Sequence, residues 1–550
     1  MAEALDLLRD NRTEDLWNKC CGFININIEQ FMTIQNQLLM EQIELLKNCE
    51  LGKKLLHGNA PKTLEEFREQ VPLTLYDDYM PHLSEKIETG LPEKPLLWQR
   101  TSGRSSEYSN KWVPITNRMY RELGDFFIAL LMFSSCTERG EVAIQSGDRF
   151  LYALAPPPYA SGCWAHRLDE EEIFRFLPSV DEAEKMEFQD RIEAGFSMGM
   201  AEGIDMMAAI ASILVAVGER FGKGGSIKRL PSMLNKPRIL GRLLRGVIKS
   251  KLARRPLMPK DIWSIKGLVS TGTDSNVYRE TIKEMWGRYP LDIYGATESI
   301  IIAMQTWDYG DMTFVPNLNL LEFLPEAEHA KWAADHTYKP RILLLNEVIP
   351  GERYVIVITN FLGGAFVRYV LEDIVTITDL RNSNLNINIP QMTFYGRASD
   401  IIDFEAFTHA FFTEKMLWQG ISNIGCDYVD WVARKEVIKN SPMLHIYIEL
   451  KEGQTNGAEE LTASLHEELK TLNEDYDDLE RFFGFKPLKV TVLPQGAFNR
   501  YMQQRRDEGA DIAHLKPPHM NPKDRVIESL LGVEVPSAAA TDETGARINT

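Results

Sequence analysis

The loop between Arg100 and Thr116 carries residue types that can bind an anion. Its hydroxyl-bearing and glycine residues are Thr101, Ser102, Gly103, Ser105 and Ser106. Small side chains let backbone N–H groups approach phosphate oxygens, and Lys111 adds a positive charge nearby. A polar surface turn has the same composition, so the loop alone does not decide between the two interpretations.

A second group of polar residues follows a short apolar strand in the segment Ile293–Ser299, IYGATES. At the end of a strand, Tyr294 can stack on a nucleotide base, Thr297 offers a hydroxyl and Glu298 can bind Mg²⁺. The alternative is an ordinary strand-to-helix turn with Glu298 near the helix start, where a carboxylate is favoured by the helix dipole.

Three more polar residues stand further along the chain. Asp373 interrupts the apolar strand FVRYVLEDIV, so it is either a ligand for hydroxyl groups or lies at the solvent end of the strand. Arg397 follows a glycine in YGRASD, and Lys516 precedes two prolines in a late loop. A loop lysine taken alone is usually solvated, so only the order of these groups carries weight.

In this order, the groups resemble the adenylate-forming superfamily of acyl-CoA synthetases, luciferases and peptide-synthetase adenylation domains. The sequence is more similar to the acyl-acid-amido synthetases that conjugate jasmonate or auxin to amino acids in plants, and to their bacterial relatives. The segments that carry this resemblance are FREQVPLTLYDDYMPHLSEKIETG, LLLNEVIPGERYVIVITN and LPQGAFNRYMQQRRDEGADIAHLKPPH. It extends over residues 35–525, nearly the whole chain.

The resemblance implies an ATP-dependent ligase that uses Mg²⁺ and works in two steps. A carboxylate attacks the α-phosphate of MgATP to give an acyl-adenylate and pyrophosphate. An amine, typically that of an amino acid, then displaces AMP and forms an amide. The crowded negative charge must be neutralised by Mg²⁺, lysine and backbone dipoles.

The resemblance also implies which residues contact the nucleoside. Tyr294 would pack on adenine, and the turn STGTD, with Gly272 and Thr273, would line the same base. Asp373 would accept hydrogen bonds from the ribose hydroxyls, and Arg397 would lie near the ribose or phosphate.

At the phosphate end, the resemblance implies that the loop 101–106 and Lys111 hold phosphate oxygens while Glu298 binds Mg²⁺. Lys516 would be carried to the α-phosphate or carboxylate on a small domain that pivots near Asp400. Glu298 and Lys516 are therefore the predicted catalytic residues.

Two regions depart from the family's pattern. Arg104 replaces a threonine in a loop that lacks its second glycine, and Lys111 comes one residue late. Glu372 stands where the family has glycine before the strand aspartate. One alternative hypothesis is therefore a relative that binds a nucleotide or acyl ligand without turnover. Another is a ligase that forms acyl-coenzyme A.

Composition limits the remaining possibilities. A chain of 550 residues with 44% hydrophobic and 25% charged residues is typical of a globular protein with a large and a small domain. A net charge of −18 disfavours nucleic acid as a partner. The six scattered cysteines form no zinc or disulfide pattern, and the first residues lack an apolar run, so we expect a cytoplasmic protein.

The predicted fold class is α/β. Residues 266–294 alternate strand, turn, helix and strand, and Tyr354–Thr359 (YVIVIT) reads as a strand buried on both faces. We expect a large adenylation domain over 1–402, with sheets covered by helices and a barrel-like part. A small, mobile α+β domain of β-β-α-β order would occupy 403–535, and 536–550 would form a disordered tail.

Two further segments predict helices. The apolar run Met206–Gly218 is predicted as a core helix that could border an acyl pocket. Residues 223–260 contain twelve basic residues and no acidic one, and 238–255 reads as a basic amphipathic helix. We favour a solvated basic face whose apolar side packs on the core. The alternative is a helix that lies on an anionic membrane or receives an acidic partner, although membrane association is otherwise not expected.

Overall fold

The computed structural model describes the chain except for residues 1–3, 101–110, 155, 187, 223–236, 272–274, 399–401, 404–410, 439–440, 455–456, 474–475, 478–485, 508–514 and 533–550. The chain divides into two compact units, Met1–Tyr395 and Gly396–Thr550. The predicted domain boundary after residue 402 lies a few residues beyond this division. The segment predicted as a disordered tail lies outside the described residues.

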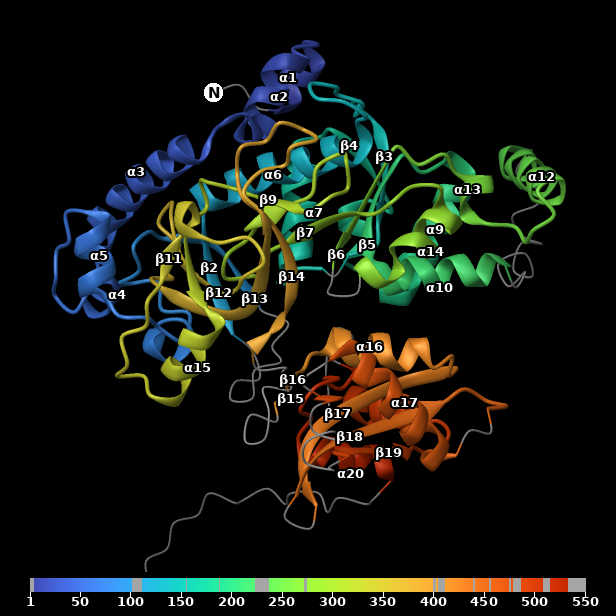
Figure 1. Cartoon of the computed structure of the whole chain (residues 1–550). Helices are drawn as coiled ribbons and strands as arrows, with labels where there is room; N and C mark the ends of the chain where they lie inside the picture. The colour runs from blue at the N-terminus through green and yellow to red at the C-terminus, as the bar shows by residue number, and fades with distance from the viewer. Residues whose placement is uncertain are drawn as a thin grey trace, which may run out of the picture. The chain divides into compact units, whose positions relative to one another are not determined.

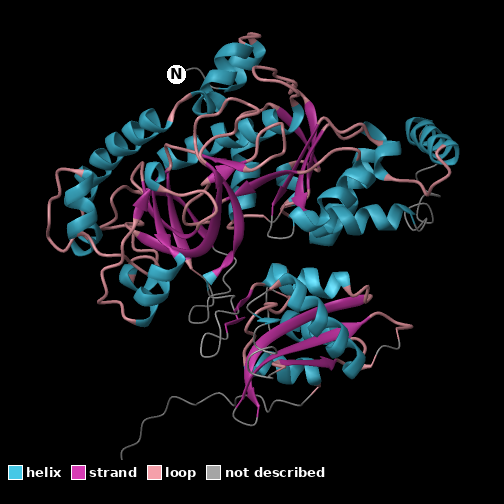
Figure 2. Ribbon diagram, in the orientation of Figure 1, coloured by secondary structure: helices cyan, strands magenta, loops and turns pink. Residues whose placement is uncertain are grey.

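The first unit is built on one sheet, which contains 12 strands within the described residues (Figures 1 and 2). The strands at one end are parallel to each other. In spatial order they are β4 (Phe174–Leu177), β3 (Asp148–Tyr152), β5 (Met206–Ile210), β6 (Gly267–Thr271) and β7 (Leu291–Tyr294). Helix α14 (Ser275–Trp286) connects β6 to β7, which confirms the predicted strand–helix–strand order.

The remaining strands of this sheet continue from β7, mostly with antiparallel pairing. They are β8 (Ala303–Met304), β9 (Met312–Phe314), β14 (Gln391–Arg397), β13 (Tyr369–Asp379), β12 (Arg353–Asn360), β10 (Asn319–Pro325) and β11 (Leu343–Leu344). Strand β12 contains the β-branched run and is buried over nearly its whole length, as predicted. The sheet therefore changes from parallel to antiparallel at β7.

The apolar run Met206–Gly218 does not form a single helix. It forms strand β5 followed by α10 (Ala211–Gly222), so the prediction of one core helix there is wrong. The physical reason is that a strand buried on both faces of a parallel sheet reads as a continuous apolar run, just as a buried helix does. Met206 and Met207 are both fully buried, although they point to opposite faces.

Helices cover both faces of the parallel half. Met206 and Ala208 of β5 join one apolar cluster, and Met207 and Ala209 join another on the opposite face. The first face is covered by α1 (Ala4–Arg9), α2 (Thr13–Cys21), α6 (Asn117–Ser135), α7 (Ala160–Glu170) and α8 (Val180–Ala183). The second is covered by α9 (Phe188–Glu202), α10, α12 (Pro237–Leu252), α13 (Pro259–Ile262) and α14. This layering confirms the α/β fold class.

The antiparallel half is covered by α3 (Ile28–Lys47), α4 (Glu50–Leu55), α5 (Leu64–Gln70) and α15 (Glu326–Ala334). Short 3₁₀ turns occur at η1 (Gly22–Asn25), η2 (Tyr76–Tyr79) and η3 (Leu345–Glu347). A separate antiparallel pair, β1 (Pro95–Arg100) and β2 (Trp112–Thr116), flanks the predicted anion-binding loop.

The second unit contains the predicted β-β-α-β order. Strands β17 (Tyr428–Ile438) and β18 (Ser441–Leu450) are antiparallel, and β19 (Leu488–Val492) lies parallel to β18. The other elements are α16 (Glu414–Asn423), α17 (Ala458–Leu472), α19 (Ala497–Asp507), α20 (Asp524–Leu531) and the pair β15 (Ile402–Asp403) and β16 (Phe411–Phe412).

The cysteines and the apolar helices bear on two expectations drawn from the sequence. All six cysteines are free thiols. Among the described residues, no helix has both the length and the apolar character needed to cross a membrane.

Candidate functional site

The predicted turn after Tyr294 lies where the sheet changes from parallel to antiparallel. Strand β7 ends at Tyr294, and β8 returns beside it with Ala303 opposite Tyr294. Gly295 permits this reversal, because a Cβ there would lie 2.1 Å from the carbonyl oxygen of Ile300. Ligands of open α/β sheets bind outside the carboxyl ends of the strands. Thr297 and Glu298 therefore occupy a position suited to ligand binding.

Two buried asparagines hold this turn. Asn360 Nδ2 donates to the carbonyl oxygen of Glu298 at 2.9 Å, and Asn319 Nδ2 donates to that of Ser299 at 2.8 Å. Asn360 Nδ2 also donates to Asn319 Oδ1 at 2.8 Å, which links the two side chains. Sequence reasoning missed both residues, because they come from β10 and β12 and have no shared motif.

A hydrogen bond joins the side chain of Asp373, on β13, to that of Tyr294, at the end of β7. The Tyr294 hydroxyl donates to Asp373 Oδ2 at 3.1 Å, and the Tyr294 ring lies 5.5 Å from that of Phe394. Asp373 is only 5% exposed, so it does not lie at the solvent end of its strand. The structure therefore brings together two residues for which the sequence predicted nucleoside contacts.

Glu372, the residue before this aspartate, has a left-handed backbone with φ of 61°. The pairing of β13 with β12 shifts register opposite this residue, between Val355 and Val357. Glycine adopts this conformation freely, whereas a side chain with a Cβ is strained there. The departure from the family's glycine thus imposes a backbone cost at a bulge next to Asp373.

Lys111 lies in a group of tyrosines. Its Nζ donates to the Tyr369 hydroxyl at 3.3 Å and lies 5.3 Å from the centre of the Tyr76 ring. Burial raises the pKa of Tyr369, and the charges of Glu298 and Glu372 raise it further, so its hydroxyl stays protonated. This places Tyr369, which sequence reasoning also missed, within electrostatic reach of the predicted Mg²⁺ ligand.

Several predicted residues lie outside the described residues. They are Thr101, Ser102, Gly103, Arg104, Ser105, Ser106, Gly272, Thr273 and Asp400. Their predicted contacts with phosphate or adenine therefore stay predictions, as does the pivot.

Arg397 and Lys516 belong to the second unit. Arg397 is exposed at the end of β14. Lys516 Nζ forms an ion pair with Asp430 Oδ2 at 3.1 Å. His519 Nε2 contacts Asp430 Oδ1 at 2.8 Å, and His519 Nδ1 contacts Glu414 Oε1 at 2.5 Å. The result is a chain of alternating charge, which we call the Lys516 cluster: Glu414, His519, Asp430 and Lys516.

Mutual contacts keep His519 and Asp430 of the Lys516 cluster ionised. Burial lowers the pKa of His519, but Asp430 and Glu414 overcome this effect and raise it to about 9. Burial raises the pKa of Asp430, but its bonds to His519 and Lys516 bring it down to about 2. At neutral pH, His519 is therefore a buried cation between two carboxylates.

Backbone contacts fix the segment that carries this histidine. Ala433 N donates to the His519 carbonyl oxygen at 2.6 Å, and Asn521 N donates to that of Ala433 at 2.8 Å. The His519 ring stacks on Trp431, with ring centres 4.7 Å apart. Lys516 thus stands three residues from a firm attachment to β17. The KPPH motif contained this signal, but its histidine was not recognised.

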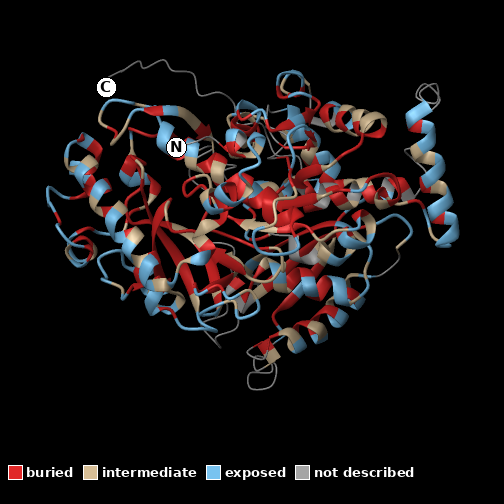
Figure 3. Cartoon of the chain, turned by 90° about the horizontal axis from the view of Figure 1, so that it is seen from above, coloured by how far each residue is buried: buried red, intermediate tan, exposed pale blue. Residues whose placement is uncertain are grey.

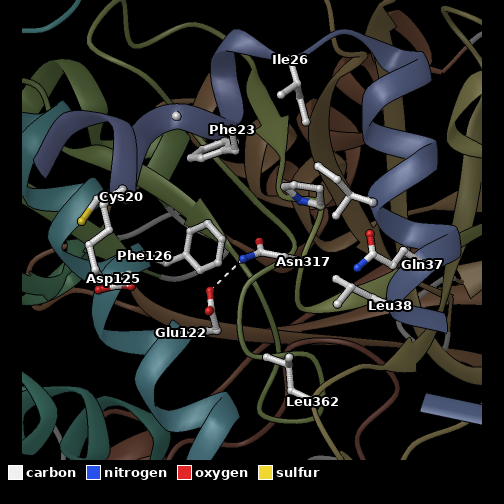
Figure 4. Close-up of a pocket in the computed structure, with 14 residues that line it drawn as sticks. Cys20, Phe23, Ile26, Gln37, Leu38, Glu122, Asp125, Phe126, Asn317 and Leu362 are labelled. Atoms are coloured by element: carbon white, nitrogen blue, oxygen red, sulfur yellow. Dashed lines mark hydrogen bonds and ion pairs between the residues drawn. The ribbon is translucent and has the colours of Figure 1, made fainter. Parts of the chain in front are cut away.

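A cavity of about 430 Å³ lies elsewhere in the first unit, between α2, α3 and α6 (Figure 4). Phe23, Leu38 and Phe126 form apolar walls, and Asn317 Nδ2 donates to Glu122 Oε2 at 2.7 Å. None of the predicted site residues that the structure describes lines this cavity.

Comparison with known proteins places the chain in a family. The GH3 family N-terminal domain matches residues 23–153, the central domain matches 312–397 and the C-terminal domain matches 415–524. Together these matches cover more than half of the chain. The chain belongs to the GH3 family. The resemblance drawn from the sequence is therefore confirmed.

Two GH3 relatives are each 25% identical to this chain. One is the 4-substituted benzoates-glutamate ligase GH3.12 of Arabidopsis thaliana, aligned over 40% of this chain and 38% of that protein. The chain thus matches about two fifths of that relative's length. The other is the probable indole-3-acetic acid-amido synthetase GH3.4 of Oryza sativa subsp. japonica, aligned over 90% of this chain and 87% of that protein.

Solved structures share the fold of this GH3 chain. The AtGH3.15 acyl acid amido synthetase in complex with 2,4-DB matches with a TM-score of 0.65 at 15% identity, covering 94% of this chain and 96% of that one. A 2-hydroxyisobutyryl-CoA ligase in the postadenylation state matches with a TM-score of 0.55 at 13% identity, covering 89% and 90%. The GH3 central domain contains Asn319, Asn360 and Asp373, and the GH3 C-terminal domain contains Lys516 and His519.

Proposed function

We propose that this GH3 chain is an ATP-dependent ligase that activates a carboxylic acid as its adenylate and transfers the acyl group to an amino acid. The observation that carries the proposal is the hydrogen bond between Tyr294 and Asp373, beside the Glu298 turn that Asn360 holds, at the carboxyl end of β7. The names of the two GH3 relatives, a benzoate–glutamate ligase and a probable amido synthetase, support the same reaction class.

In the first step, a carboxylate oxygen of the acid bonds to the α-phosphorus of ATP, and the bond from this phosphorus to the bridging oxygen breaks. Pyrophosphate leaves with the electron pair. Tyr294 packs on adenine, and Asp373, oriented by the Tyr294 hydroxyl, accepts from the ribose. These contacts hold the α-phosphate in line with the carboxylate, which lowers the entropic part of the barrier.

Mg²⁺ belongs to the same proposal. Among the described residues, no cluster of three or more side chains could hold a metal ion by itself. Mg²⁺ is commonly bound by one or two carboxylates together with substrate phosphates. Glu298, 9% exposed and fixed through its carbonyl by Asn360, would supply the carboxylate. The ion would neutralise charge on the phosphates.

In the second step, the amine nitrogen bonds to the acyl carbon, the bond to the AMP oxygen breaks and the amine loses a proton to solvent. Lys516 serves the first step, where its ammonium group approaches the α-phosphate and the attacking carboxylate. Lys516 would leave Asp430 when substrate oxygens replace this carboxylate as the partner of its ammonium group. A reducing, cytoplasmic location completes the proposal, since all six cysteines are free thiols.

The test is pyrophosphate release from MgATP with a panel of carboxylic acids that includes benzoates and indole acids. We expect Glu298→Gln to lower release about 100-fold, because one oriented charge contact in such a transition state contributes on that scale. Glu29→Gln, an exposed carboxylate on α3, is the matched control and should leave release unchanged.

The alternatives give different results in the same assay. No release with any acid, together with ATP binding in calorimetry, would establish a binding protein without turnover. Release followed by a thioester with coenzyme A, and no amide with any amino acid, would establish an acyl-CoA-forming ligase.

A further inference from the structure

Helix α12 exposes a row of large apolar side chains. Leu240, Leu244, Ile248 and Leu252 are 50%, 60%, 50% and 80% exposed. Residues four apart in a helix lie on neighbouring positions of one face, so these side chains form a continuous stripe. We call them the α12 stripe. Elsewhere in the described residues, exposed large apolar side chains are single and scattered.

The other face of α12 attaches the helix firmly to the first unit. Arg242 donates to the backbone carbonyl oxygens of Gly199, Met200 and Glu202 at the end of α9. At Gly246 the helix approaches α13 so closely that a Cβ would lie 2.6 Å from the side chain of Ile262. These contacts fix the orientation of α12 and leave the α12 stripe on its outer side.

This arrangement differs from the packing favoured by sequence analysis. The apolar side of this helix is expected from the sequence to pack on the core. Ile239 is buried and Leu243 and Val247 are half-buried, whereas Leu240, Leu244 and Ile248 are exposed. The apolar surface of α12 is wider than the contact that α9 and α13 offer. Figures 1 and 3 show α12 at the edge of the first unit, with exposed residues along its length.

Basic side chains lie next to the α12 stripe. Arg238, Arg245, Lys249 and Lys251 are exposed on the same helix. Within the part of the chain that the structure describes, none of these four forms an ion pair. The segment 223–260 contains no acidic residue, although the whole chain has a net charge of −18. The outer face of α12 is thus apolar and cationic in a protein that is otherwise strongly acidic.

We propose that α12 docks on an anionic lipid surface. The α12 stripe would enter the boundary between headgroups and acyl chains, and Arg245 and Lys249 would contact lipid phosphates, as in interfacial amphipathic helices. A helix of 16 residues with cations throughout its length lies on a bilayer rather than crossing it.

Charge and shape favour this surface over the alternatives. A second copy of the chain would place Arg245 and Lys249 of two helices close together, and their repulsion would oppose pairing. A protein partner would need an acidic groove to receive a projecting helix, whereas a flat membrane accepts it without one. Binding to anionic lipid also explains why residues 223–260 contain twelve basic residues and no acidic one.

The test is co-sedimentation of the full chain with phosphatidylcholine vesicles that contain or lack phosphatidylserine. We expect binding only with phosphatidylserine and weaker binding in high salt. Leu244→Glu combined with Ile248→Glu should abolish it. Arg245→Gln combined with Lys249→Gln should weaken it about tenfold or more, since each cation near such a surface contributes about fivefold.

The controls are exposed residues elsewhere. Leu380→Glu, at a 49% exposed leucine, and Lys451→Gln should leave vesicle binding unchanged. Circular dichroism and MgATP turnover report whether the α12 variants keep their fold, because none of these residues belongs to the proposed active site. Absence of binding to phosphatidylserine vesicles would overturn the proposal. So would a concentration-dependent dimer that Leu244→Glu dissociates while vesicles fail to bind.

Discussion

Two polar clusters of this molecule are built from different kinds of contact. In the first unit, the Tyr294 hydroxyl donates to Asp373, and the backbone carbonyl oxygen of Glu298 accepts from Asn360. In the second unit, the Lys516 cluster alternates anion and cation over four side chains. The first arrangement presents carboxylates beside polar hydroxyl groups, which suits a cation and the hydroxyls of a nucleotide. The second is neutral as a whole and holds its lysine until stronger anions compete for it.

The difference indicates how the work is divided between the units. Under the proposed function, the first unit would orient ligand groups with the buried hydrogen bonds of Tyr294 and Asn360. The second stores a charged side chain in a titratable cluster. Four experiments would break or sharpen this comparison.

The largest effect is expected at Lys516. Lys516→Ala should lower acyl-adenylate formation about 100- to 1,000-fold, because a charge aimed at the transition state is lost. Pyrophosphate release measures it. Lys451→Ala, an exposed lysine of the same unit, is the matched control. A rate within twofold of the unsubstituted protein would show that the Lys516 cluster is only structural.

The second experiment concerns pH. Since the folded-state pKa of His519 is raised from 6.5 to about 9, its stabilising charge is fully present below pH 6.5 and is lost as pH rises through 9. We expect the second unit to lose a few kcal/mol of unfolding free energy over this window. Urea denaturation followed by the fluorine NMR signal of fluorotryptophan at Trp431 measures it.

His519→Gln should remove this pH dependence, whatever its effect on stability at pH 6. The same titration should leave the unfolding free energy of the first unit nearly unchanged. A first unit that lost as much stability over the same window would break the comparison between the two clusters.

The third experiment concerns Asn360, which holds the Glu298 turn together with Asn319. Asn360→Ala leaves the Glu298 carbonyl oxygen and Asn319 Oδ1 without the Nδ2 donor of Asn360 in a buried site. We expect a loss of about 1–3 kcal/mol in unfolding free energy of the first unit, the usual cost of an unsatisfied buried group. Calorimetric unfolding measures it. The affinity for ATP should fall as well. An unchanged affinity would show that Asn360 stabilises the fold but does not position the residues that bind ATP.

The smallest effect is expected at Glu372. Glu372→Gly should stabilise the first unit by up to about 1 kcal/mol, because glycine relieves the left-handed strain at some cost in chain entropy. Glu172 has the same conformation, with φ of 51°, far from the predicted site. Glu172→Gly should give a similar gain in thermal unfolding. Only Glu372→Gly should also tighten ATP binding, because it removes a negative charge near Glu298.

Much of the fold could be predicted because it depends on local patterns. The strand–helix–strand order of β6, α14 and β7 follows from alternating apolar periods and turn residues, and the buried run of β12 reads directly as a strand. The prediction of one helix over Met206–Gly218 failed because strands and helices that are buried on all sides look alike in sequence.

The residues of the site also divide into those that local sequence patterns predict and those that only tertiary contacts reveal. The sequence by itself determined the family and the order of Tyr294, Glu298, Asp373 and Lys516, because residue types and spacing are local properties. Only the tertiary structure decided that Asn319 and Asn360 brace the turn and that His519 and Asp430 hold the lysine. The tertiary structure likewise decided which side of α12 is exposed. These facts depend on contacts between distant segments, and no local spacing encodes such contacts.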